Sequence, residues 1–246
     1  MENLKEKKAL VIGGSGGIGA AISKQLANNV AEIVIHGSKN SDTFTNLKKE
    51  LSQKTLVRTI VQPLETDFSK NFPTSELYQE ITLADIICVC FGPFLQKQIH
   101  EMNIDEWENI INLDFLLPSL VVTTALPNMM QKKWGRFLLF GGTRTDRVNA
   151  FATNPAYGAA KTAISSLTRS TALGYASYGI TCNAIFPGFT QTEYLSADYS
   201  SALCNKMPQK RLISPTEIAE VAMSILEQPM VNGALLPVDG GWDPAF

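Results

Sequence analysis

The sequence predicts an α/β domain in which helices cover both faces of a parallel sheet of about seven strands. Three observations lead to this fold class. Short β-rich apolar runs alternate with longer amphipathic stretches, most of these runs are nearly continuous, and no linker or low-complexity tract interrupts the pattern. Continuous apolar strands are typical of parallel sheets buried on both faces. Unbroken strand–helix alternation then predicts one doubly wound domain over residues 1–246.

Each expected strand is a short apolar run. The seven are 9–13, 32–37, 55–61, 85–92, 135–142, 180–188 and 234–241. Helices are predicted where small and apolar residues recur at three- and four-residue spacing, most clearly at 18–29, 104–115 and 156–179. Pro187 and Gly188 end the sixth strand, and we expect the polar segment near 190–213 to be a mobile loop that covers the substrate.

Composition narrows the class of protein. Of 246 residues, 45% are apolar and 18% charged, which suits an ordinary folded domain, and the net charge of -2 argues against a nucleic-acid partner. The start MENLKEKK lacks the apolar stretch of a secretory signal. The most apolar run, FLLPSLVVTTAL from Phe115, is too short and too polar to span a bilayer. We therefore expect a cytoplasmic protein that does not act at a membrane.

Cysteine and histidine usage predicts neither a disulfide nor a metal site. The cysteines stand at positions 88, 90, 182 and 204, and Cys88 and Cys90 alternate so that both point to one face of a strand. Reduced, buried thiols are favoured over a disulfide in that setting. The only histidines, His36 and His100, have no partner at the spacing of zinc ligands.

A glycine-rich loop, GGSGGIG from Gly13 to Gly19, follows the first strand and leads directly into a helix. Glycines allow close approach to a diphosphate, and the helix start offers free N–H groups. A plain tight turn is the alternative, but the position between strand one and a helix favours phosphate binding. The candidate nucleotide contacts in this loop are Gly13, Ser15, Gly16, Gly17, Ile18 and Gly19.

Several ordered segments resemble the short-chain dehydrogenase/reductase family, close to the 3-oxoacyl-acyl-carrier-protein reductase type of its classical branch. GGSGGIG is similar to the TGxxxGIG loop, with Ile12 where threonine is usual. YGAAK, ending at Lys161, matches YxxxK, NAIFPGFTQT (183–192) is similar to NxxxPGxxxT, and GALLPVDGGW (233–242) to the C-terminal strand. The resemblance covers nearly the whole chain. It implies a Rossmann-type fold, a nicotinamide cofactor and a homotetramer or homodimer built on helices around 104–131 and 156–178.

Tyr157 and Lys161 are four residues apart, so on a helix they share a face. A carbonyl that takes hydride also needs a proton, which a phenol can supply, but at its usual pKa near 10 a phenol cannot easily serve both reaction directions near neutral pH. A neighbouring ammonium lowers that pKa. The resemblance implies that Tyr157 is the acid/base of an NAD(P)-dependent carbonyl reduction or alcohol oxidation, and that Lys161 tunes it and holds the nicotinamide ribose. A surface pair without chemistry is the alternative.

Other positions depart from the family pattern. The helper serine falls on the pair Gly141–Gly142, so Thr143 is the candidate replacement. The helper asparagine falls on Asp114, which adds a charge that the amide lacks, and NNAG appears as Val89–Gly92, where only the glycine is kept. Losing one oxygen donor typically costs about a hundredfold or more in rate. A nucleotide-binding sensor or scaffold with little turnover therefore remains the alternative function.

The end of the second strand bears on the choice of nucleotide. No carboxylate appears there before Asp42, and Ser38 and Lys39 suit a 2′-phosphate, so NADP is favoured over NAD. Asp67 resembles the family's adenine-contacting aspartate. The remaining candidate nucleotide contacts are Phe68, Cys90, Phe91, Gly92, Pro187, Gly188, Thr190 and Thr192.

Loops at strand ends supply the candidate substrate contacts, because doubly wound folds bind ligands at that edge. They are Phe94, Arg144, Arg147, Phe151, Phe189 and Tyr194. The two arginines suit a carboxylate or phosphate, but solvated loop charges are the favoured explanation for them. The aromatic side chains suit a partly apolar carbonyl compound. No particular substrate follows from them.

Overall fold

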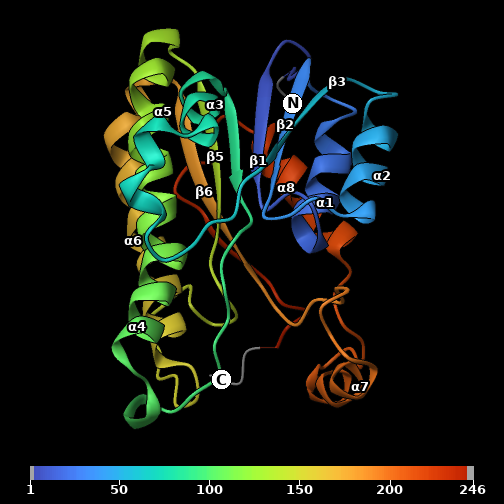
Figure 1. Ribbon diagram of the computed structural model, residues 1–246, viewed down its shortest axis with the longest axis vertical. Coiled ribbons are helices and arrows are strands. Elements are labelled where there is room, and N and C mark those ends of the chain that lie inside the picture. Colours follow the sequence, from blue (N-terminus) through green and yellow to red (C-terminus); the bar gives the residue numbers. More distant parts are fainter. Residues whose placement is uncertain (1–2, 243–246) are drawn as a thin grey trace.

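In the computed structural model, residues 3–242 are described, and within them seven parallel strands form one sheet in the order β3-β2-β1-β4-β5-β6-β7 (Figure 1). The strands are β1 (Lys8–Ile12), β2 (Glu32–Gly37), β3 (Leu56–Val61), β4 (Ile86–Val89), β5 (Gly135–Phe140), β6 (Ile180–Pro187) and β7 (Leu235–Val238). Each expected strand is present, and the predicted fold class is confirmed. The first two and last four residues of the expected 1–246 domain lie outside the described residues.

Helices fill the connections between the strands. They are α1 (Gly17–Leu26), α2 (Asp42–Leu51), α3 (Glu76–Leu83), α4 (Ile104–Ile111), α5 (Leu117–Lys132), α6 (Pro155–Tyr175), α7 (Ala197–Lys206) and α8 (Pro215–Leu226). A π-helical turn, η4 (Asn112–Leu116), joins α4 to α5. The prediction that this helix ends at residue 115 was wrong, because the chain continues through the π turn into α5.

Two apolar cores lie on opposite faces of the sheet. Ala9 and Val11 of β1 pack in the core beneath α1, α2 and α8, whereas Leu10 and Ile12 pack in the core beneath α3, α5 and α6. Figure 1 shows these two helix layers on either side of the strands. Successive strand residues point to opposite faces, so burial on both faces explains why the strand sequences are continuously apolar.

The helical run Ile104–Lys132 is the one stretch of residues 3–242 that is long and apolar enough, by length and composition, to cross a membrane. Half of its most apolar window is buried inside the domain. Val121, Ala125 and Met129 of α5 belong to the core against the sheet. Packing against the sheet therefore explains why the face of α5 that carries these three residues is apolar.

The order of the strands sets the place of a ligand site. β1 pairs with β2 on one side and with β4 on the other, so the connections leave β1 in opposite directions. The crevice at such a switch point, beyond the carboxyl ends of the strands, is where doubly wound folds bind ligands. The carboxyl ends point toward the lower part of Figure 1, near α4 and α7.

Candidate active site

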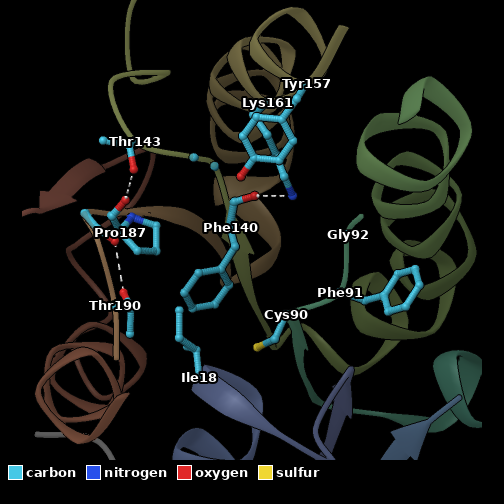
Figure 2. Close-up of a pocket in the computed structure, with 13 residues that line it drawn as sticks. Ile18, Cys90, Phe91, Gly92, Phe140, Thr143, Tyr157, Lys161, Pro187 and Thr190 are labelled. Carbon is cyan, nitrogen blue, oxygen red and sulfur yellow. Dashed lines mark hydrogen bonds between the residues drawn. The ribbon is translucent and has the colours of Figure 1, made fainter. Parts of the chain in front are cut away.

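A cavity of about 220 Å³ lies beyond the carboxyl ends of β4, β5 and β6, beside the start of α1 (Figure 2). Its lining combines loop backbone, a phenol and an ammonium. The lining residues are Ile18, Cys90, Phe91, Gly92, Phe140, Gly141, Gly142, Thr143, Tyr157, Lys161, Pro187, Gly188 and Thr190. All of these except Phe140, Gly141 and Gly142 belong to the predicted catalytic or nucleotide-binding set, so the fold brings together residues from five separate segments.

The glycine loop lies next to this cavity and contributes Ile18 to its lining. Gly13 has a φ of 74° and Gly17 a φ of 50°, a region that favours glycine. A Cβ on Gly13 would lie 3.0 Å from backbone atoms of Cys90 and Phe91. The loop after β1 therefore packs directly on the loop after β4, and the start of α1 can approach a ligand closely.

His36 holds the glycine loop in place, a role that the sequence analysis did not assign. Its Nε2 lies 2.8 Å from the carbonyl oxygen of Gln62, which can only accept, so Nε2 carries the proton. Nδ1 is then free to accept the N–H of Gly13 at 3.3 Å. Burial lowers the pKa of His36 to about 4, which keeps the ring neutral. A histidine within an apolar strand is the sequence signal that could have indicated this contact.

Tyr157 and Lys161 both project into the cavity from α6, as Figure 2 shows. Lys161 Nζ lies 5.9 Å from the centre of the Tyr157 ring and donates a hydrogen bond to the Phe140 carbonyl oxygen at 3.2 Å. On the other side, Phe94 packs edge-on against Tyr157, with 5.0 Å between ring centres. The helical spacing inferred from the sequence thus places the phenol and the ammonium at one site.

Asp114 pairs with Lys161 below the surface of the site. Asp114 Oδ1 lies 3.0 Å from Lys161 Nζ, and its side chain is fully buried. A Cβ on Gly92 would collide with Asp114 Oδ1, so the carboxylate fills the space beside that glycine. Asp114 stands in the π turn η4, and such turns occur often at functional sites.

The expected lowering of the tyrosine pKa is not found in the structure. Burial raises the pKa of Tyr157 above its usual value, and the charge of Asp114 raises it further. Burial also raises the pKa of Asp114 to about 6, although Lys161 acts in the opposite direction. The Lys161 ammonium is therefore paired with Asp114, and its positive charge does not outweigh the effects that raise the pKa of Tyr157.

Gly142 stands where the family's helper serine is expected. A Cβ there would lie 2.7 Å from both Cε1 and the hydroxyl oxygen of Tyr157, so the tyrosine occupies that space. Thr143, the candidate replacement, lines the cavity, but its hydroxyl donates to the Pro187 carbonyl oxygen at 2.9 Å (Figure 2). Thr143 thus lies at the site with its proton directed to the backbone and away from Tyr157.

The segment 190–196 reaches back over the start of α1. Glu193 Oε1 and Oε2 accept the N–H of Gly17 at 3.0 and 3.3 Å. The Tyr194 hydroxyl lies against Gly16, and Thr192 lies against Gly17. A helix N-terminus is an anion-binding position, so the chain's own carboxylate occupies the place that a phosphate group would take. The sequence offered no signal for this contact, which depends on how the segment folds back.

The other predicted nucleotide contacts lie apart from the cavity. Ser38 and Lys39 are exposed beyond the end of β2, and Ser15 packs on Gly37 next to them. Asp67 is also exposed and pairs with Lys70 at 3.2 Å. The Phe68 side chain is buried in the core against Phe72, which leaves only its backbone for a ligand.

The predicted substrate contacts are more scattered than the nucleotide contacts. Phe94 lies on Tyr157, and Tyr194 lies on the glycine loop. Phe151 packs on Gly158 of α6, and Phe189 packs against Trp242 in a tilted arrangement with 4.7 Å between ring centres. Arg147, by contrast, lines a separate groove along α6, outside the cavity.

Cysteine and acidic side chains show no further site in the described part of the chain. The cysteines are free thiols: Cys88 and Cys182 are buried, whereas Cys90 and Cys204 are partly exposed. Cys88 and Cys90 do pack toward the same core, but Cys90 lies beyond the end of β4 and reaches the cavity. In residues 3–242, no three His, Cys, Asp or Glu side chains gather in a way that could hold a metal ion.

The sheet order and the glycine loop that opens α1 define a doubly wound α/β protein of the Rossmann class. Residues 7–201 match the family model described as short chain dehydrogenase. The chain belongs to this family and is similar to the 3-oxoacyl-acyl-carrier-protein reductases of its classical branch.

Relatives of established name match over nearly their full length. The chain is 30% identical to the 3-oxoacyl-acyl-carrier-protein reductase FabG of Vibrio harveyi, with 97% of this chain and 98% of that protein covered. It is 29% identical to the D-beta-hydroxybutyrate dehydrogenase of Cupriavidus necator, with the same coverage.

A solved structure supports the fold. The 3-oxoacyl-acyl-carrier-protein reductase of Agrobacterium tumefaciens C58, determined with NADP bound, superposes with a TM-score of 0.85. It is 21% identical, with 97% of this chain and 95% of that chain covered.

Proposed function

We propose that the protein is an NAD(P)-dependent oxidoreductase that interconverts a carbonyl compound and the corresponding alcohol. The observation that carries this proposal is the convergence of Tyr157 and Lys161 on one cavity beside the glycine loop. Both named relatives act, by their names, on a carbonyl or hydroxyl compound. Reduction then joins one hydride and one proton to the carbonyl, and oxidation reverses both transfers.

The glycine loop fits the diphosphate of a dinucleotide. In support, the Gly17 N–H donates to the Glu193 carboxylate, an anionic acceptor, and the Gly16 N-cap gives α1 no side-chain cap. Ser38 and Lys39, exposed beyond β2, suit a 2′-phosphate, so we favour NADP over NAD. Bound nicotinamide supplies or accepts the hydride.

The chain's own residues handle the proton and the binding. Tyr157 donates its phenolic proton to the carbonyl oxygen during reduction and takes it back during oxidation. Lys161 is anchored by the Phe140 carbonyl and by Asp114, so its ammonium is fixed at the edge of the cavity to hold ribose hydroxyls. The segment 190–213, which contains α7, is proposed to cover the substrate.

The test is consumption of NADPH or NADH with a panel of ketones and 3-oxoacyl thioesters. Tyr157→Phe removes the proton donor and is expected to reduce kcat by a factor of about a hundred or more. Tyr78→Phe, a hydroxyl deletion in the ring cluster with Phe72 far from the cavity, is the matched control and should retain activity. Equal activity of the Tyr157→Phe enzyme would contradict the proposed role.

A nucleotide-binding sensor with little turnover is the second candidate. The observation in its favour is that Gly142 supplies no hydroxyl and Thr143 directs its own to Pro187. Nucleotide binding measured by calorimetry, without Tyr157-dependent consumption on any member of the panel, would support the sensor over the enzyme.

A further inference from the structure

The strongest unexplained feature of the site is a carboxylate buried beside the proposed proton donor. Asp114 has no exposed side-chain surface, and its Oδ1 lies 3.0 Å from Lys161 Nζ. Neither Asp114 oxygen accepts a hydrogen bond within the described structure, so its polar contact is the ion pair with Lys161. A buried charge is costly unless it is paired, so Lys161 is the group that makes this carboxylate tolerable in the interior.

The pairing changes what Lys161 can do for Tyr157. An ammonium next to a phenol stabilises the phenolate, but a carboxylate at hydrogen-bond distance from that ammonium cancels most of its field. The site then contains a phenol, an ammonium and a carboxylate with no net charge. An amide at position 114 would leave the full positive charge beside Tyr157.

We propose that Asp114 is a positioning residue that neutralises Lys161 and thereby keeps Tyr157 protonated, which biases the site toward carbonyl reduction. This inference rests on the proposed function, because reduction uses the protonated phenol and oxidation uses the phenolate. Asp114 acts through Lys161 and does not itself line the cavity.

The titratable groups around the cluster of Asp114, Lys161 and Tyr157 support the inference. From α6, Lys161 and Tyr157 face Asp114, and from the end of β4, Cys90 lies close enough to feel the charge of Lys161. Burial raises the pKa of the Cys90 thiol well above its usual value, so it stays neutral. Among the titratable groups described around the cluster, Asp114 is therefore the one whose charge opposes that of Lys161.

The pH dependence of the two directions tests the inference. Asp114→Asn removes the negative charge, so the rising limb of alcohol oxidation should move to lower pH by about one unit or more. The alkaline decline of carbonyl reduction should move in the same direction. Because the pKa of Asp114 is about 6, the wild-type and Asp114→Asn profiles should converge below that pH. Superimposable profiles across the whole range would overturn the inference.

Two further variants test whether the pH shift comes from the lost charge at position 114 and not from damage to the fold. Asp114→Ser removes the same charge with a smaller side chain and should shift the profile in the same direction. Glu108→Gln removes a charge from an exposed position on α4, in the same helical run, and should leave the profile unchanged. Circular dichroism verifies that each protein is folded. A shift in Glu108→Gln equal to that in Asp114→Asn would indicate a general charge effect and contradict the specific role.

Tyrosine titration separates this inference from the proposed function. Ultraviolet difference spectra report ionisation without turnover. Asp114→Asn should show one tyrosine that ionises at lower pH than in the wild type, and Asp114→Asn combined with Tyr157→Phe should lack it. No nicotinamide consumption in the wild type would reject the proposed enzyme while leaving this readout valid. Identical titrations of the wild type and Asp114→Asn would reject the role of Asp114.

Discussion

At the residue scale, the absence of a side chain at position 142 is as informative as the side chains that are present. Tyr157 occupies the space in which a Gly142 side chain would stand, and the adjacent Gly141 meets the Phe186 ring. The glycine pair therefore lets the proposed proton donor lie directly on the loop after β5. This packing gives the pair a structural reason that a sequence comparison with serine-containing relatives does not provide.

We expect Gly142→Ser to impair the protein even though it restores the hydroxyl typical of the family. A Cβ 2.7 Å from the Tyr157 ring forces the tyrosine to move, and such overpacking costs about 1–3 kcal/mol of stability. Chemical denaturation and kcat measure the two effects. Ala159→Ser, which adds a hydroxyl at an exposed position of the same helix, is the control and should change stability by about 0.5 kcal/mol or less. A rise in kcat in Gly142→Ser would show that the tyrosine has room to adjust.

His36 links stability to pH through its contact with the glycine loop. Its pKa is lowered from 6.5 to about 4, so the unfolded chain binds the proton more readily between these values. The stabilising contribution of neutral His36 is complete above pH 6.5 and is lost as the pH falls toward about 4, on the order of 3 kcal/mol in total. Asp114, with a pKa raised to about 6, changes stability in the opposite sense over nearly the same range.

The effect of His36→Gln can be predicted from the opposite pH dependences that His36 and Asp114 give to stability. Glutamine does not titrate, so the variant should keep its stability better than the wild type as the pH falls from 6.5 to 4. Urea unfolding at closely spaced pH values measures the free energy of unfolding of both proteins. The control is His100→Gln, which removes an exposed histidine. Parallel stability curves for wild type and His36→Gln would contradict the neutral-histidine interpretation.

At the scale of elements, the segment after β6 and the start of α1 are in direct contact. Glu193 accepts the Gly17 N–H, so the diphosphate that we propose to bind at the glycine loop would have to displace this carboxylate, which has the same sign of charge. The contact also ties the proposed cover segment to the nucleotide position. Binding of the nucleotide and movement of this segment should therefore be coupled.

Glu193→Gln is expected to tighten nucleotide binding. The change removes a negative charge from the diphosphate position and weakens the hydrogen bonds that close it, because charge-assisted bonds are about twice as strong as neutral ones. Calorimetric Kd values for NADPH should fall about fivefold or more, which corresponds to about 1 kcal/mol. Asp198→Asn, an exposed acid on α7 of the same segment, should change Kd little. Weaker binding in Glu193→Gln would indicate that the carboxylate helps to hold the nucleotide.

At the scale of the whole molecule, the outer surfaces of α5 and α6 suggest self-association. A groove of about 520 Å³ between these helices is lined by apolar and aromatic residues, such as Met130 and Tyr175, together with hydroxyl side chains such as Ser170. Leu173 of α6 is 88% exposed. Burying such surface against a second copy is favourable, so we propose this face as the interface of the homodimer or homotetramer that the family resemblance implies.

Leu173→Glu should shift the protein toward the monomer, because it places a charge on this proposed interface. Sedimentation velocity over a range of protein concentrations measures the distribution. Lys39→Glu, which also introduces an acidic side chain but at an exposed position on the loop after β2, is the control and should leave the distribution unaltered. A wild-type protein that sediments as a monomer at all concentrations would refute the expected oligomer.

Much of the site could be predicted because it depends on local spacing. The glycine loop follows a strand and opens a helix, and Tyr157 and Lys161 lie one helical turn apart, so their positions follow from the chain alone. Helix ends were less predictable. The helix expected at 104–115 continues to Lys132, because the π turn that carries Asp114 is stabilised by packing between α4, α5 and α6.

The sequence by itself determined the fold class, the glycine loop and the Tyr–Lys pair, since each arises from periodicity or from residues close together in the chain. The tertiary structure decided which partners these groups meet. The family resemblance already implied that Asp114 belongs to the site, but its ion pair with Lys161, 47 residues away in the chain, and the contact of Glu193 with Gly17 across 176 residues are seen only in the fold. Local spacing carries no information on such contacts, yet they set the charge around Tyr157 and at the diphosphate position. The electrostatics of this site are therefore a property of the folded chain.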